Sequence, residues 1–285
     1  MNLAYHDAKY ADLYEETMYN ALLGAIDLQG ENYFYDNPLS SGTMRYNWHG
    51  CPCCVGNIPR TLLMIPTWTY VKSNDGIYVN MYIGSTIKID RVAGTEVEMV
   101  QKTDYPWSGK VEITVNPQQN ARFTVYIRVP DRTTSDLYTP VPEVNSLKSL
   151  TVNGDPVQMN VVKGYIGISK DWKEGDRISL EIPMEVQVIT PDERIEADRG
   201  RVALRYGPMI YNTEKTDQPE IDKPLGNGPF SATWEPGMLK GIMAIRGAWA
   251  DGSPLTAIPN YARLNRPVSR AEGDRSPTSI VWLRK

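Results

Sequence analysis

Cysteine is scarce in this sequence: only three occur among 285 residues, and all lie between positions 51 and 54. A disulfide framework is therefore excluded, because no cysteine elsewhere in the chain could pair with them. Long apolar runs are also lacking, and none approaches the roughly 18 residues of a membrane-spanning helix. The first residues do not form a secretory signal. The compartment stays unknown, because a signal upstream of residue 1 is compatible with this sequence.

A surplus of positive charge is missing as well. The chain has 30 Lys and Arg against 34 Asp and Glu, which gives a net charge of −4. A broad nucleic-acid-binding surface needs clustered basic residues, so we expect no nucleic-acid partner. Without an apolar span we expect no membrane partner either. The sequence also lacks the glycine patterns of nucleotide-binding loops and the serine nucleophile elbow.

The hydrophobic pattern changes along the chain. Apolar residues recur at three- and four-residue steps over 5–25 and again over about 57–71, so both segments are expected to be helices. Pro66 is expected to kink the second helix or to end it early. From about 76 to 212 the period is two, with turn signals between the runs, which is typical of an all-β sandwich. Residues 214–235 are expected to form a long loop, and further strands follow it.

Acidic residues gather in two places. On the first expected helix they are interpreted as a solvated face; these residues are Asp7, Asp12, Glu15 and Glu16. A second acidic stretch, Asp192 to Asp198, lacks the spacing, the glycine and the closing glutamate of a calcium loop. This stretch is therefore interpreted as ordinary surface.

The sharpest chemical signal is the cysteine segment Trp48-His49-Gly50-Cys51-Pro52-Cys53-Cys54, which precedes the second expected helix. Asn57 is expected to cap that helix, and the positive end of a helix favours ionisation of a nearby thiol. A thiolate is both a nucleophile and a soft metal ligand, while His49 is a ligand, a base or neither. Metal or catalytic chemistry is favoured over three small buried hydrophobic residues. A complete zinc site needs further ligands, and the only other histidine is His6.

The cysteine segment resembles the signature of a known family. The pattern Cys-x-Cys-Cys-x-x-Asn-x-x-Arg of the β-L-arabinofuranosidases of glycoside hydrolase family 127 is similar to the run from Cys51 to Arg60. Val55-Gly56 stands where the best-known members carry Pro-Pro, which marks a divergent branch. Further segments resemble the family in the same order over nearly the whole chain: 7–12, 19–21, 33–39, 75–84, 205–208 and 255–262.

The resemblance implies an (α/α)6 barrel followed by β-sandwich domains, and a distinctive catalytic centre. In this family a zinc-bound cysteine attacks the anomeric carbon, a glutamate is the acid/base, and three cysteines with one glutamate hold the zinc. By match of motif, Cys53 is the nucleophile and a zinc ligand, Cys54 is a second ligand, and Cys51 is a neighbour. The candidate substrate contacts that the resemblance supplies are Tyr33, Tyr35, Trp48 and His49.

The sequence also departs from the family pattern upstream of the cysteine motif. The family's other zinc ligands form a Glu-x-Cys pair upstream of the paired cysteines, and its acid/base glutamate also lies upstream. No Glu-x-Cys pair occurs in this sequence. We therefore expect a mainly β fold in which residues 1–72 are a two-helix remnant of the barrel that carries the cysteine motif. Residues 73–212 are expected to form a β-sandwich, and residues 213–285 a linker with strands that complete the sandwich region.

The function that the resemblance implies is that of a fragment of a retaining glycosidase acting on plant-type glycans. Such a fragment would be inactive alone, because the acid/base and half of the zinc site belong to the missing N-terminal helical barrel of the same protein. Two alternatives stay open. One is a non-catalytic β-sandwich module that binds carbohydrate or packs against a partner, and the other is a thiol or metal structural protein.

Overall fold

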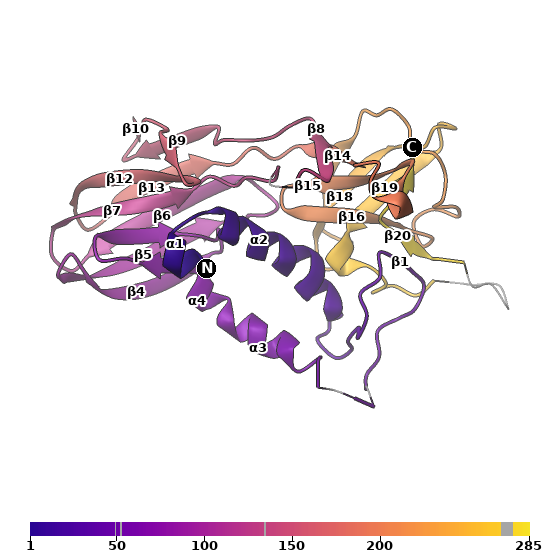
Figure 1. Cartoon of the computed structure of the whole chain (residues 1–285), viewed down its shortest axis with the longest axis horizontal. Helices are drawn as coiled ribbons and strands as arrows, with labels where there is room; N and C mark the ends of the chain where they lie inside the picture. Colours follow the sequence, from indigo (N-terminus) through magenta and orange to yellow (C-terminus); the bar gives the residue numbers. More distant parts are fainter. Residues whose placement is uncertain (49, 52, 134, 269–275) are drawn as a thin grey trace. The chain divides into compact units, whose positions relative to one another are not determined.

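The chain folds into two compact units, each assembled from segments that are distant in the sequence. Unit 1 comprises residues 1–15, 62–134 and 145–184, and unit 2 comprises residues 16–61, 135–144 and 185–285. Strands dominate both units (Figure 1), which confirms the expected mainly β fold. In the part of the chain that is described, no helix is long and apolar enough to cross a membrane. This computed structural model describes residues 1–48, 50–51, 53–133, 135–268 and 276–285.

Unit 1 contains two sheets. Their strand orders are β10-β9-β13-β6-β5-β4 and β11-β12-β7-β3-β2, and only the β3–β7 pair is parallel. Alternate residues are buried along β5 and β6 of the first sheet and along the middle of β7 in the second, so each sheet has one apolar face, as a period of two predicts. The strands are β2 (Tyr70–Lys72), β3 (Gly76–Val79), β4 (Ser85–Val92), β5 (Thr95–Thr103), β6 (Lys110–Pro117), β7 (Ala121–Arg128), β9 (Ser149–Val152), β10 (Asp155–Pro156), β11 (Val161–Val162), β12 (Tyr165–Trp172) and β13 (Asp176–Glu181).

Unit 2 is built on one sheet with the path β17-β18-β19-β16-β15-β14-β8, on which β1, β20 and β21 pair at the side. Short 3₁₀ turns lie at Glu196–Asp198 and Asn260–Ala262. The expected loop over 214–235 is wrong at its end, because Ser231–Glu235 pairs with β18. The strands are β1 (Ser40–Ser41), β8 (Tyr138–Val141), β14 (Val186–Pro191), β15 (Arg201–Tyr206), β16 (Met209–Glu214), β17 (Ser231–Glu235), β18 (Ile242–Ala248), β19 (Pro254–Pro259), β20 (Ser279–Ile280) and β21 (Leu283–Arg284).

The helices are shorter than the sequence pattern predicts. The first expected helix begins as α1 (Asn2–Tyr5), is interrupted at His6 in the left-handed conformation, and resumes as α2 (Lys9–Thr17). A π-helical turn (Met18–Leu22) and a 3₁₀ turn (Leu23–Ala25) complete it. The second is divided into α3 (Asn57–Met64) and α4 (Pro66–Thr69), with Pro66 at the start of α4, where its missing N–H costs nothing. It ends before residue 71, because Tyr70 pairs with β3.

The acidic residues of α2 do not form a solvated face, so that interpretation was wrong for two of them. Asp12 and Glu15 are buried, and both form ion pairs with the fully buried guanidinium of Arg128 on β7. The phenol of Tyr105 donates a hydrogen bond to Glu15 and accepts one from Arg132. Burial raises the pKa of Asp12 to about 6, although Arg128 opposes the rise. α2 is therefore attached to the sheet by buried charge.

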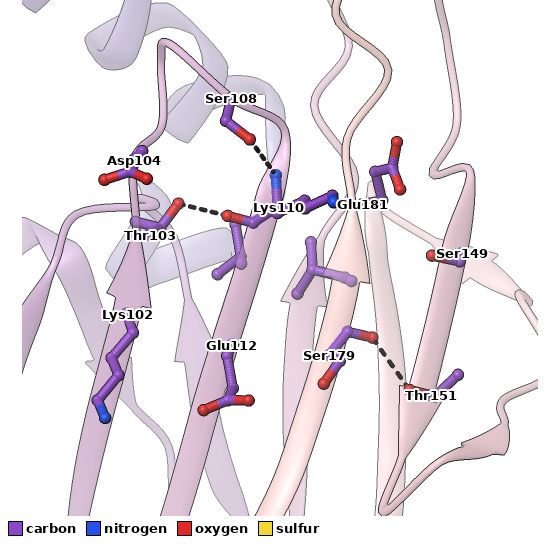
Figure 2. Close-up of a pocket in the computed structure, with 12 residues that line it drawn as sticks. Lys102, Thr103, Asp104, Ser108, Lys110, Glu112, Ser149, Thr151, Ser179 and Glu181 are labelled. Carbon is purple, nitrogen blue, oxygen red and sulfur yellow. Dashed lines mark hydrogen bonds between the residues drawn. The ribbon is translucent and has the colours of Figure 1, made fainter.

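The outer face of the six-stranded sheet carries a polar groove of about 570 Å³ (Figure 2). Its side chains come from adjacent positions on neighbouring strands: Lys102 lies opposite Glu112, and Glu112 lies opposite Ser179. Ser179 in turn lies opposite Thr151, whose hydroxyl donates a hydrogen bond to the Ser179 carbonyl. No aromatic ring is among the residues that line this groove.

Replacement of Gly76 by alanine is expected to destabilise unit 1 by about 1–3 kcal/mol, the usual cost of overpacking. Gly76 lies opposite Thr124 in the parallel pair, and a Cβ there would come within 2.2 Å of the Thr124 carbonyl oxygen. Urea unfolding followed by circular dichroism measures the loss. Gly84→Ala is the control, because its nearest neighbours would be at 3.9 Å. Equal midpoints for the two variants would contradict this explanation.

Candidate functional site

The three thiols form a cluster at the surface of unit 2. Cys51, Cys53 and Cys54 are free and exposed. The Sγ atoms of Cys51 and Cys53 are 3.4 Å apart, and those of Cys53 and Cys54 are 3.7 Å apart. The alternative of three buried hydrophobic residues is therefore wrong for this cluster, since all three side chains reach solvent.

One tyrosine reaches the cluster. The hydroxyl oxygen of Tyr35 lies 3.4 Å from the Sγ of Cys54, so the structure brings together a predicted substrate contact and a predicted zinc ligand. This hydrogen bond, together with the charges of the neighbouring thiolates, raises the pKa of Tyr35 to about 12. Tyr35 is therefore a phenol, and not a phenolate, at neutral pH, and its O–H can donate to Cys54.

The two paired thiols have opposite pKa shifts. Hydrogen bonds with Cys51 and Cys54 raise the pKa of Cys53 above its ordinary value. Hydrogen bonds with Tyr35 and Cys53 lower the pKa of Cys54. The lowered pKa of Cys54 therefore comes from its hydrogen-bond partners and not from the helix end, and the pKa of Cys53 is shifted in the opposite direction.

The helix that follows the thiol cluster, α3, includes Asn57, which the sequence predicts as the cap in front of it. Asn57 is the first residue of α3, and its N–H donates to the carbonyl of Cys54 at 3.0 Å. Its side-chain oxygen accepts a hydrogen bond from Arg60, one turn along. The side chain of Asn57 is therefore committed to Arg60 and does not serve as the predicted cap.

The loop that carries Tyr35 is held by two arginines that sequence reasoning missed. The ring of Phe34 is buried between the guanidinium groups of Arg45 and Arg263, whose carbons lie 4.4 and 4.8 Å from its centroid. Arg45 also donates to the carbonyls of Gly24, Tyr261 and Arg263. No local sequence signal marks this arrangement, because Arg263 lies more than 200 positions from both Phe34 and Arg45.

The other predicted substrate contacts are Tyr33, Trp48 and His49, and they differ in their surroundings. Tyr33 pairs with Tyr46 through two backbone hydrogen bonds of 2.8 Å, which fixes the strand-like start of the loop. Trp48 is 74% exposed. His49 lies outside the described residues, as does Pro52 of the motif. Among the predicted contacts that the structure describes, Tyr35 is the residue placed against a thiol.

The donor set of the cluster fits part of a zinc site. Two thiolates on a tetrahedral zinc with bonds of about 2.3 Å lie about 3.8 Å apart, close to the 3.7 Å between Cys53 and Cys54. Within the described residues, no group of three or more His, Cys, Asp or Glu side chains has the arrangement of a complete metal site. Cys53 and Cys54 thus fit two positions of such a site.

Three family models of glycoside hydrolase family 127 match successive parts of the chain. The catalytic-domain model of β-L-arabinofuranosidases matches residues 1–67, which include the thiol cluster. The middle-domain model of the same enzymes matches residues 76–184, and the C-terminal-domain model of the family matches residues 186–272. Together they account for most of the chain.

Individual relatives agree with these models. A non-reducing end β-L-arabinofuranosidase of Bifidobacterium longum subsp. longum is 29% identical over 231 residues, which are 74% of this chain and 32% of that protein. The solved structure of a family 127 β-arabinofuranosidase matches 99% of this chain with 31% identity and a TM-score of 0.88, over 46% of its own length. A family 127 β-L-arabinofuranosidase from Geobacillus stearothermophilus T6 matches with 29% identity and a TM-score of 0.81, over 99% of this chain and 47% of its own.

The chain therefore spans about a third of the curated relative and about half of these two solved structures. Within that span the agreement extends from the cysteine motif to the C-terminal strands, in sequence and in fold. The chain belongs to glycoside hydrolase family 127.

Proposed function

We propose that this chain contributes the nucleophile and two zinc ligands to a retaining glycosidase of the β-L-arabinofuranosidase type that acts on plant-type glycans. The observation that carries the proposal is the geometry of the cluster: Cys53 and Cys54 lie 3.7 Å apart, and Tyr35 contacts Cys54. This cluster lies in the segment that the catalytic-domain model matches.

In the proposed reaction the Cys53 sulfur attacks the anomeric carbon, and the bond to the leaving oxygen breaks. The acid/base donates a proton to that oxygen, and a covalent glycosyl–Cys53 bond forms. Water, deprotonated by the same acid/base, then displaces the sulfur, so the two inversions give net retention. When bound by Cys53 and Cys54, zinc would keep these thiols deprotonated near neutral pH. Tyr35 donates its O–H to Cys54 and orients it.

The acid/base and the remaining zinc ligands are proposed to come from outside residues 1–285. The sequence has no Glu-x-Cys pair, which supports this assignment. Under this proposal α2 and α3 belong to the helical barrel, and the rest of the barrel is the partner. Tyr33, Trp48 and His49 are proposed to contact the sugar.

Zinc titration of the 285-residue chain tests the ligand assignment. We expect the chain to bind zinc weakly, because two ligands hold zinc poorly. Cys53→Ser and Cys54→Ser should each lower the zinc affinity by at least a further factor of about ten. Competition against a chromophoric chelator measures these affinities. Cys51→Ser is the matched control and should bind within about twofold of the parent chain. Tight zinc at one per chain that is lost in Cys51→Ser would mean that the three cysteines form the site by themselves.

The activity test uses hydrolysis of 4-nitrophenyl β-L-arabinofuranoside. The 285-residue chain alone is expected to be inactive, and the gene product that joins it to the acid/base region is expected to hydrolyse the substrate with retention at the anomeric carbon. Product configuration, followed by NMR during turnover, decides the stereochemistry. An inverted product would overturn the double displacement.

A further inference from the structure

A cavity of about 480 Å³ opens in unit 2. This volume lies within the range of about 300–1,000 Å³ that is usual for small-molecule sites. Its lining comes from segments far apart in the sequence: Leu39 and Ser40 at β1, the turn before β15, the loop after β16, and the strands at the C-terminal end. None of these residues belongs to the thiol cluster.

The feature that distinguishes this cavity is a fixed aromatic ring. The Trp282 side chain lines it and packs against the buried cluster of Ile189, Ala203 and Val281. Trp282 also stacks against Tyr138, with ring centroids 5.9 Å apart and an angle of 23° between the planes. Its carbonyl accepts a hydrogen bond of 2.8 Å from Arg201. The indole is thus held in place by its neighbours, and Trp282 is only partly buried.

The polar groups of the cavity carry both signs of charge. Three carboxylates, Asp198, Glu220 and Asp222, line it together with the cations Arg201 and Lys215. Arg201 and Asp222 form an ion pair of 3.2 Å, in which both side chains keep more than a third of their surface exposed. Because both signs of charge line the cavity, a strongly charged ligand of either sign would lie near a group of like charge, which disfavours such a ligand.

The hydrogen-bonding capacity is also mixed. Carboxylates only accept hydrogen bonds and guanidinium groups only donate them, whereas sugar hydroxyls do both. The Asp198 side chain is partly buried, and this burial raises its pKa. The C–H face of a sugar ring matches the flat apolar face of an indole, and its hydroxyls match the surrounding carboxylate and guanidinium groups.

We propose that this cavity binds a neutral saccharide, with the sugar ring on Trp282 and its hydroxyls on Asp198 and Arg201. The groove of Figure 2 is of similar volume but lacks a ring, and so does not favour a sugar in the same way. The proposed site is independent of Cys53, so its existence does not depend on the glycosidase activity.

Affinity electrophoresis of the 285-residue chain in gels containing arabinan, with a second series containing a soluble glucan, tests the proposal. We expect retardation in at least one polysaccharide, and at least a tenfold weaker apparent affinity for Trp282→Ala. Trp234→Ala is the matched control, because Trp234 is an exposed tryptophan of the same unit on β17 and does not line the cavity. Its affinity should stay within twofold. Saturation-transfer NMR with L-arabinose tests whether a single sugar suffices.

Two further variants keep the test decisive if Trp282→Ala fails to fold. Asp198→Ala, at a surface turn, should weaken binding at least threefold with an unchanged melting temperature. Val162→Ala should bind as the parent chain does, because Val162 is an exposed residue of unit 1 and does not line this cavity. Absence of binding to every probe, or binding that is lost in Val162→Ala and kept in Asp198→Ala, would overturn the proposal.

Discussion

Replacement of Cys53 by alanine in the active gene product is expected to lower hydrolysis of 4-nitrophenyl β-L-arabinofuranoside at least about 1,000-fold, as the loss of a covalent nucleophile generally does. Without the sulfur, the double displacement cannot begin, and only the slower direct attack by water remains. The measurement is kcat, determined together with the melting temperature, so that a folding defect is not mistaken for a catalytic one.

The matched control for this prediction is Cys51→Ala. Its Sγ lies 3.4 Å from that of Cys53, so the substitution perturbs the same surroundings without removing the proposed nucleophile. A decrease of less than about tenfold is expected. Azide provides a second readout: it should restore turnover of Cys53→Ala by attacking from the face that the sulfur leaves open, giving a glycosyl azide of inverted configuration. Equal losses in the two variants, with no azide rescue, would remove Cys53 from the reaction.

Substitution of Arg128 by methionine is expected to destabilise unit 1 by about 3–5 kcal/mol, the cost of breaking a buried ion pair from one side. The guanidinium is fully buried, and the carboxylates of Asp12 and Glu15 would be left in the interior without their partner. Urea unfolding at pH 8 measures the change in free energy. The control is Arg122→Met on the same strand, whose ion pair with Asp171 is exposed and contributes at most about 1 kcal/mol.

The pH dependence of this variant provides an independent check. Burial raises the pKa of Asp12 to about 6, so folding takes up a proton between about pH 4 and pH 6, and acid pH favours the folded state in that window. Arg128 opposes this rise, so its removal should raise the pKa of Asp12 further. The variant should therefore be less destabilised at pH 5 than at pH 8. A penalty that grows on acidification would contradict the buried-charge explanation.

The strands of unit 1 were predictable because their local pattern determines them. Alternate burial along β5 and β6 follows directly from alternate apolar residues, and turn residues separate the runs. Strand β17 was missed, because the residues around it are rich in proline and glycine, which is typical of a loop. Its strand conformation depends on its pairing with β18, which the local sequence does not indicate.

The candidate site was predictable only where the chemistry is local in sequence. The three thiols lie within four positions of the sequence, so their pattern could be recognised as a motif. Tyr35 was inferred from the family resemblance. The burial of Asp12 could not be predicted, because its partner Arg128 is 116 residues away and a lone acidic residue on a helix is usually solvated. The contact of Arg263 with Phe34 was missed for the same reason, because the two residues are far apart in the sequence.

The contacts of Arg45 and Arg263 with Phe34 also limit which domains of this protein can be exchanged with those of a relative. The catalytic-domain model covers residues 1–67 and the C-terminal-domain model covers residues 186–272, yet Arg45 of the first and Arg263 of the second flank the same ring. A chimera that took its C-terminal module from another family member would keep the Tyr35 loop in place only if the donor brought an arginine to the position of Arg263. Recombination within the family is therefore constrained by one aromatic ring and two guanidinium groups.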